Sequence, residues 1–168
     1  FGSPEAVFAA PPAQWREVLP ARQAQALTQR PQQLDDLLTA TLEWLADNEN
    51  HRVLTLADPA YPRLLLEIPD PPLMLHASGR IDRLHTTSVA IVGSRNPTQQ
   101  GTENARAFAL HLSRMGITIT SGLARGIDAA AHLGALEGPG STIAVVGTGL
   151  DKVYPRAHQA LSRRIEQE

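Results

Sequence analysis

The second half of the chain alternates short β-branched runs with stretches of helical periodicity, and no other feature limits its possible folds as strongly. Three such runs each lead into a glycine-containing turn: Val89–Val92, Ile117–Thr120 and Thr142–Val146. The residues after each run place apolar side chains three and four positions apart, on one helical face. Strands separated by helices form a parallel sheet with right-handed crossovers. The sequence therefore predicts an α/β fold over residues 88–168, a Rossmann-like parallel sheet with helices on both faces.

The first fifty residues are predicted to form a small all-helical domain. Ser3-Pro4 has the pattern of a capped helix start, and Pro12 and Pro20 stand where further short helices could begin. A later stretch carries one apolar stripe at helical spacing, which we expect to pack on its neighbours: Leu34, Leu37, Leu38, Thr41, Leu42 and Leu45. Residues 51–87, broken several times by proline, are predicted to connect this domain (residues 1–50) to the sheet domain (residues 88–168).

Composition excludes several classes of protein. The chain has no cysteine, which removes disulfides, thiolate metal sites and cysteine nucleophiles and is typical of a reducing cytoplasm. No apolar run is long enough to span a bilayer, so we expect a cytoplasmic protein without a membrane segment. The net charge is −2, with residues 1–87 at −4 (7 Arg, 11 acids) and residues 88–168 at +2 (7 Arg, Lys152, 6 acids). This asymmetry weakly indicates an anionic partner for the second half. Because the chain begins without methionine and stops after a helical stretch, we expect it to be a fragment.

The three turns that follow the predicted strands are the candidate site. Ligands of parallel sheets bind at the carboxyl ends of the strands, where glycine lets the backbone approach and helix N-termini present N–H groups. Basic side chains accompany each turn, so the sequence predicts a phosphate-binding pocket. Its candidate residues are Gly93, Ser94, Arg95, Thr98, Gly101, Ser121, Gly122, Arg125, Gly126, Gly147, Gly149, Lys152 and Arg156.

Signals for catalysis and for cofactors are weak. Gly147-Thr148-Gly149 begins like a dinucleotide fingerprint, but Lys152 stands where the third glycine belongs, and no P-loop sequence is present. Asp128 and His132 lie one helical turn apart and could form an acid–base pair. Alternatively, Asp128 stabilises a helix start while His132 packs or hydrogen-bonds beside it. No two of the six histidines have metal-ligand spacing, so we expect no metal site. We also expect no catalytic residue and no cofactor.

Three segments of the sheet half resemble the DNA-processing protein A (DprA/Smf) family in order and spacing. They are Val89–Arg95, Ser121–Asp128 with Ala131-His132, and Thr142–Asp151 with Tyr154-Pro155. Upstream, Phe1–Glu5 and the stretch from Tyr61-Pro62 to Pro72 are also similar to that family.

The resemblance implies a protein that binds single-stranded DNA, protects incoming strands in natural transformation, helps to load RecA, works as a homodimer and is not an enzyme. It implies that Gly93, Ser94 and Arg95 form the DNA phosphate pocket, that Arg156 lies along the strand path, and that the upstream helices belong to a SAM-like domain.

The sequence departs from this family in two respects. Gln100 stands where an aromatic residue is common, and only Phe108 and Tyr154 are aromatic in the sheet half, so single-strand preference follows from the resemblance alone. The chain also stops after three predicted strands, whereas the family's sheet continues. We therefore expect much of the dimer and RecA surface to lie outside it.

Two alternatives use the same architecture. One is a nucleotide-processing hydrolase of the lysine-decarboxylase-like/cytokinin-activating type, whose Pro-Gly-Gly-x-Gly-Thr-x-x-Glu run has no counterpart here because no glutamate follows Gly147–Leu150. The other is a nucleotide-sensing scaffold, which would bind mononucleotides without binding DNA.

Overall fold

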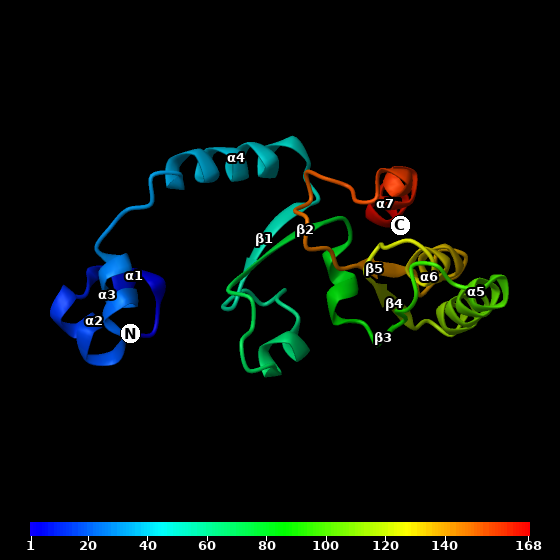
Figure 1. Cartoon of the computed structure of the whole chain (residues 1–168), viewed down its shortest axis with the longest axis horizontal. Helices are drawn as coiled ribbons and strands as arrows, with labels where there is room; N and C mark the ends of the chain where they lie inside the picture. The colour runs from blue at the N-terminus through cyan, green and yellow to red at the C-terminus, as the bar shows by residue number, and fades with distance from the viewer. The chain divides into compact units, whose positions relative to one another are not determined.

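The computed structural model describes all of residues 1–168, and the chain divides into two compact units, Phe1–Trp44 and Leu45–Glu168. The elements of both are labelled in Figure 1. None of the helices combines the length and the apolar character that crossing a membrane requires.

The first unit consists of short helices that begin at the predicted positions. Helix α1 (Pro4–Ala9) is capped by Ser3, whose hydroxyl accepts the Ala6 N–H at 3.2 Å, and α2 (Pro12–Val18) and α3 (Ala21–Leu27) follow prolines. Trp15 is buried and donates its indole N–H to the Val7 carbonyl at 2.8 Å. Helix α4 (Leu34–Asp47) runs into the second unit. Its predicted apolar stripe is not buried: Leu34, Leu37, Leu38 and Leu42 are all exposed, so the expectation that it packs on its neighbours is wrong for these leucines.

The second unit begins with a two-stranded antiparallel sheet inside the predicted connector. It is formed by β1 (His51–Thr55) and β2 (Met74–Ser78), in a register that pairs Leu54 with Leu75. The 3-10 helices η1 (Arg63–Glu67) and η2 (Ile81–His85) follow the two strands. Tyr61 is fully buried here, and its hydroxyl donates to the Pro72 carbonyl at 2.7 Å.

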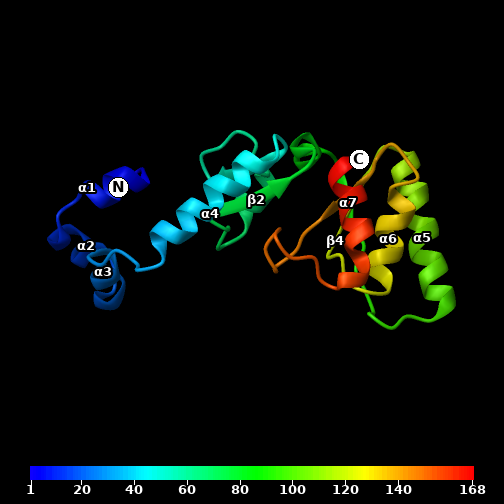
Figure 2. The same cartoon turned by 90° about the horizontal axis from the view of Figure 1, so that it is seen from above.

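The predicted parallel sheet is confirmed. Strands β3 (Ser88–Ala90), β4 (Thr118–Ser121) and β5 (Thr142–Ala144) lie side by side in chain order, and both pairs are parallel. They alternate with α5 (Gln99–Arg114), α6 (Ile127–Ala135) and α7 (Gln159–Gln167). Figure 2 shows these helices next to one another. Gly116, with φ +81°, follows the end of α5, where a left-handed backbone conformation favours glycine.

The sheet and its helices are joined by a core of small side chains. Ile119 on β4 packs with Ala109 of α5 and with Ala131 and Ala135 of α6. Helices α5 and α6 approach closely because Gly134 has no side chain; a Cβ there would overlap the Arg106 carbonyl oxygen.

All three helices pack on one face of the sheet. Ile119 contacts α5 and α6, while Ala144 and Val146 pack near Leu161 of α7. Ile119 pairs with Thr142, and Ala144 lies two residues further along β5, so these side chains share a face. The expected α/β class holds, but in this chain helices cover one face and not both. The strand order follows the chain order, so every right-handed crossover returns on the same side.

Candidate functional site

The three predicted turns meet at one edge of the parallel sheet. They surround a cleft of about 360 Å³ at the carboxyl ends of β3, β4 and β5. It is lined by Arg95, Asn96, Gly122, Ala124, Arg125, Val145, Val146, Gly147, Thr148, Tyr154 and Pro155. Of the thirteen predicted residues, Arg95, Gly122, Arg125 and Gly147 therefore face the cleft directly.

The first turn, after β3, presents Arg95 and fixes the start of α5. The Ser94 hydroxyl accepts the Asn96 N–H at 3.1 Å, and the Thr98 hydroxyl accepts the Gly101 N–H at 3.1 Å as the cap of α5. Gly93 leaves space for Ile127, since a Cβ there would lie 2.9 Å from Ile127 Cγ1. These neighbours hold the turn, and the exposed Arg95 is its cleft residue.

The second turn, after β4, is held by side chains from within the protein. Ser121 is buried and donates its hydroxyl to the Ile91 carbonyl at 2.7 Å. Asp128 Oδ2 accepts the N–H of Gly122 at 3.1 Å and of Ala124 at 3.3 Å. These two backbone N–H groups, which the sequence pattern assigned to a phosphate, thus bind the chain's own carboxylate. The contribution of the second turn to the cleft is the side chain of Arg125.

Gly126 allows the second turn to pack closely against the first. It has φ +79° and ψ −122°, a conformation open mainly to glycine, and it packs on the Ser94 carbonyl. The next residue, Ile127, donates its N–H to that same carbonyl at 3.1 Å. Gly126 therefore positions both arginine-bearing turns.

The third turn, after β5, lines the cleft with Gly147 and Thr148. The Thr148 hydroxyl donates to the Lys152 carbonyl at 3.1 Å, and Lys152 Nζ lies 3.8 Å from Asp151 Oδ2 with both side chains largely exposed. Gly149, with φ +78°, lies within this loop but outside the cleft lining.

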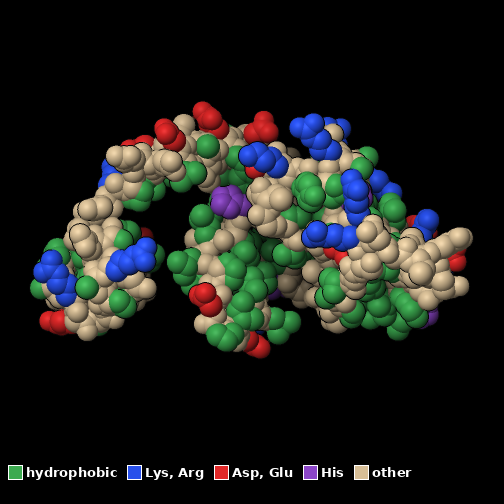
Figure 3. Space-filling model, in the orientation of Figure 1, with side chains coloured by type: hydrophobic (Ala, Val, Ile, Leu, Met, Phe, Trp, Pro, Cys, Tyr) green, Lys and Arg blue, Asp and Glu red, His purple; other side chains and the backbone are tan.

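The cations of the cleft are free of internal partners. None of the ion pairs in the structure involves Arg95, Arg125 or Arg156. Arg156 follows the cleft residue Pro155 and begins the 3-10 helix η3 (Arg156–His158). Figure 3 shows several Lys and Arg side chains gathered over the region of β5 and α7. The cleft thus has positive charge at its walls that no carboxylate neutralises.

Asp128 and His132 each have a structural role. His132 is fully buried, and burial lowers its pKa from 6.5 to about 4, so the imidazole is neutral near pH 7. Thr142 gives its hydroxyl hydrogen to the Ile119 carbonyl at 2.6 Å, so His132 Nδ1–H donates to Thr142 Oγ1 at 2.7 Å. His132 Nε2 then accepts the Leu123 N–H at 3.3 Å. Both ring nitrogens are occupied, which supports the structural alternative over an acid–base pair.

The sequence did not single out Tyr154 as a site residue, although it is part of the Tyr154-Pro155 motif. Its side chain is 69% exposed and lines the cleft. Tyr154 lies ten residues beyond the end of β5, and no periodicity indicates that the loop returns to the end of the strand. The motif itself was the only signal in the sequence.

Residues 52–168 match the family model described as DNA recombination-mediator protein A. The chain is 47% identical to Protein Smf of Synechocystis over 124 residues, which cover 71% of this chain and 31% of that protein. It is 40% identical to Protein Smf of Escherichia coli over 144 residues, or 86% of this chain and 37% of the relative. The chain thus spans about a third of the length of these relatives.

Two solved structures share the fold. The X-ray structure of DNA processing protein A from Streptococcus pneumoniae matches with a TM-score of 0.77 and 34% identity, over 95% of this chain and 54% of that chain. A structure of DNA processing protein A from Helicobacter pylori, concerned with its single-stranded DNA binding mode, matches with a TM-score of 0.62 and 32% identity. That match covers 69% of this chain and 52% of the Helicobacter chain.

Proposed function

The chain belongs to the DNA recombination-mediator protein A family, and from this premise we propose that it binds single-stranded DNA in the cleft at the carboxyl ends of β3, β4 and β5. The observation that carries the proposal is the pair of exposed arginines, Arg95 and Arg125, on two turns that Gly126 holds together. The relative from Helicobacter pylori, with the same fold, is described by its single-stranded DNA binding mode.

The proposed mechanism is binding to the phosphate backbone. Guanidinium groups contact phosphate oxygens in a planar, two-point geometry, and such contacts do not read base identity. Lys152 and Arg156 are both exposed and add positive charge on the segment that follows the third turn. Ser94, Thr98, Gly101, Ser121 and the glycines of the turns act by shaping the backbone. Binding is therefore expected to be nearly independent of sequence and sensitive to salt.

The whole protein, in this proposal, protects incoming DNA and helps to load RecA during natural transformation and recombination, as a cytoplasmic homodimer. It does so without catalysis and without a cofactor. The absence of a free acid–base pair supports this, because Asp128 and His132 are both engaged in internal hydrogen bonds. The helical segment, residues 1–50, is proposed as the SAM-like domain, followed by a connector and the sheet domain.

Arg95→Ala and Arg125→Ala are each expected to weaken binding of labelled oligo-dT about tenfold or more. A charge-assisted hydrogen bond contributes roughly 1.5–3 kcal/mol, and losing one phosphate contact should lower the slope of log K against log salt by about 0.7. Fluorescence anisotropy over a salt series measures both quantities, with duplex DNA as a second ligand.

Arg114→Ala is the matched control. Arg114 is also exposed but lies in the last turn of α5, at the opposite edge of the sheet, so affinity and salt slope should not change. Equal losses in all three variants would indicate general electrostatic attraction and contradict a site at the cleft. Tight mononucleotide binding without oligonucleotide binding would favour the nucleotide-sensing alternative.

A further inference from the structure

We infer that Tyr154, together with Val145, forms a stacking site for one unpaired nucleobase, next to the arginines that hold the phosphates. This inference rests on the proposed function and deepens it, because it assigns single-strand preference to a specific surface of this chain. The phosphate contacts alone do not discriminate between one strand and two.

The first observation is the exposure of two apolar groups beside free cations. Tyr154 is 69% and Val145 63% exposed, and both line the cleft with Arg95 and Arg125. The Tyr154 hydroxyl makes no hydrogen bond within the protein. An aromatic face beside a positively charged groove is the combination that single-strand binders use.

The second observation is that the residues on either side of Tyr154 are packed into the protein. Val153 packs against the apolar cluster of Leu123, Leu136 and Leu161, and Pro155 is buried. The residues flanking Tyr154 are thus anchored while its side chain points outward. The backbone that carries the ring therefore needs little ordering when a base binds.

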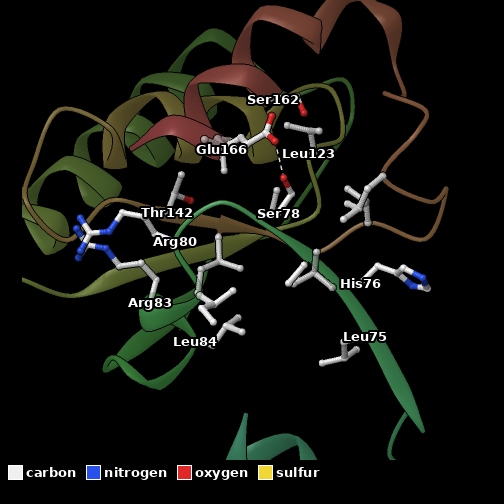
Figure 4. A pocket seen from close by; sticks show the side chains of 18 of the residues that line it. Leu75, His76, Ser78, Arg80, Arg83, Leu84, Leu123, Thr142, Ser162 and Glu166 are labelled. Carbon is white, nitrogen blue, oxygen red and sulfur yellow. Dashed lines mark hydrogen bonds between the residues drawn. The ribbon is translucent and has the colours of Figure 1, made fainter. Parts of the chain in front are cut away.

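The third observation is that the cleft adjoins a second, more apolar hollow of about 320 Å³. Val145, Val146 and Tyr154 line both spaces and form the wall between them. Figure 4 shows this hollow, with Leu75 and Leu84 in the lower part of the view and Leu123 in the upper part. Ser78 of β2 donates a hydrogen bond to Glu166 of α7, and both residues line the hollow.

These surfaces match the two halves of a nucleotide. The charged half lies at Arg95 and Arg125, and the apolar half begins at the shared wall. Only an unpaired, unstacked base can turn its flat face to Tyr154, because the faces of duplex bases are covered by their neighbours. The site therefore favours single strands without reading a hydrogen-bonding edge.

The test compares two oligonucleotides of equal length, oligo-dT and an abasic deoxyribose-phosphate strand, by anisotropy. The chain should bind oligo-dT roughly five- to a hundredfold more tightly, since stacking on an aromatic residue is worth about that factor per base. Tyr154→Ala should lose this preference and bind both strands like the abasic one, and Tyr154→Phe should keep it. Phe108→Ala is the matched control, because Phe108 is 64% exposed on α5 and lines neither space.

The outcomes separate this inference from the proposed function. If the chain binds both strands equally and Arg95→Ala still weakens binding, the phosphate site stands and the stacking site is overturned. A loss for both strands in Tyr154→Ala would also overturn it, because a structural role or a phosphate contact explains that result. If neither strand binds, the proposed function itself fails.

Discussion

Gly126→Ala is expected to destabilise the sheet unit by about 3 kcal/mol or more and to abolish binding of oligo-dT. A Cβ at this position would overlap the Ser94 carbonyl oxygen and lie 2.7 Å from Pro97 Cδ. The backbone conformation, φ +79° and ψ −122°, adds a strain of about 1–3 kcal/mol for any residue with a side chain. Overpacking against a neighbouring backbone adds roughly 1–3 kcal/mol. Relaxation would have to separate the two turns that carry Arg95 and Arg125.

Gly116→Ala is the control for this prediction. Gly116 also has a positive φ, +81°, but no atom lies within 4 Å of the position of a Cβ. The free energy of unfolding of this variant should fall by only about 1–2 kcal/mol, the cost of a left-handed backbone for alanine, and its DNA affinity should not change. Urea unfolding gives both free energies. Equal losses of unfolding free energy in the two variants would mean that the contact between the turns contributes nothing to stability.

Stability is expected to fall by about 3 kcal/mol as the pH is lowered from about 6.5 to about 4, because of His132. Burial, and to a smaller extent the nearby His158, lower the pKa of His132 to about 4, against the opposing effect of Asp128. The unfolded chain binds a proton near pH 6.5 and the folded chain only near pH 4, so between these values the unfolded state holds more protons. The stabilisation is complete above pH 6.5 and is lost as the pH falls towards 4.

His132→Gln removes the titrating group and should flatten the stability profile in this range. The variant will be less stable at pH 7, since the Leu123 N–H and the Thr142 hydroxyl lose their present geometry. His111→Gln, an exposed histidine in the last turn of α5, should leave the profile unchanged. Urea unfolding at several pH values measures the effect, and a wild-type slope retained by His132→Gln would assign the acid sensitivity to other groups.

The connector, residues 51–87, shows what local sequence patterns predict and what they do not. Its proline-rich sequence predicted breaks, and the structure pairs two of the segments between them as β1 and β2, with Leu54 opposite Leu75. The pairing brings together residues about twenty positions apart. Antiparallel pairing depends on which side chains can be buried together, and the sequence of either strand does not state this.

For the candidate site too, the sequence predicted some features and not others. The sequence placed the three turns at one edge, because the carboxyl ends of consecutive parallel strands must meet there. The sequence did not distinguish residues that face the cleft, such as Arg95, from residues that support it, such as Ser121. This distinction depends on which polar groups already have hydrogen-bond partners inside the protein. In the second turn, Asp128 accepts two backbone N–H groups, which are therefore not available to a ligand.

By itself, the sequence determined the α/β class, the parallel strands, the three turns and the resemblance to the family, because periodicity and glycine placement are local properties. Only the tertiary structure decided that the helices lie on one face, that the leucines of α4 stay exposed, and that Tyr154 lines the same cleft as Arg95 and Arg125. These facts depend on contacts between residues far apart in the chain. Such contacts are selected by how surfaces fit and which polar groups are satisfied, and these are properties of the folded molecule.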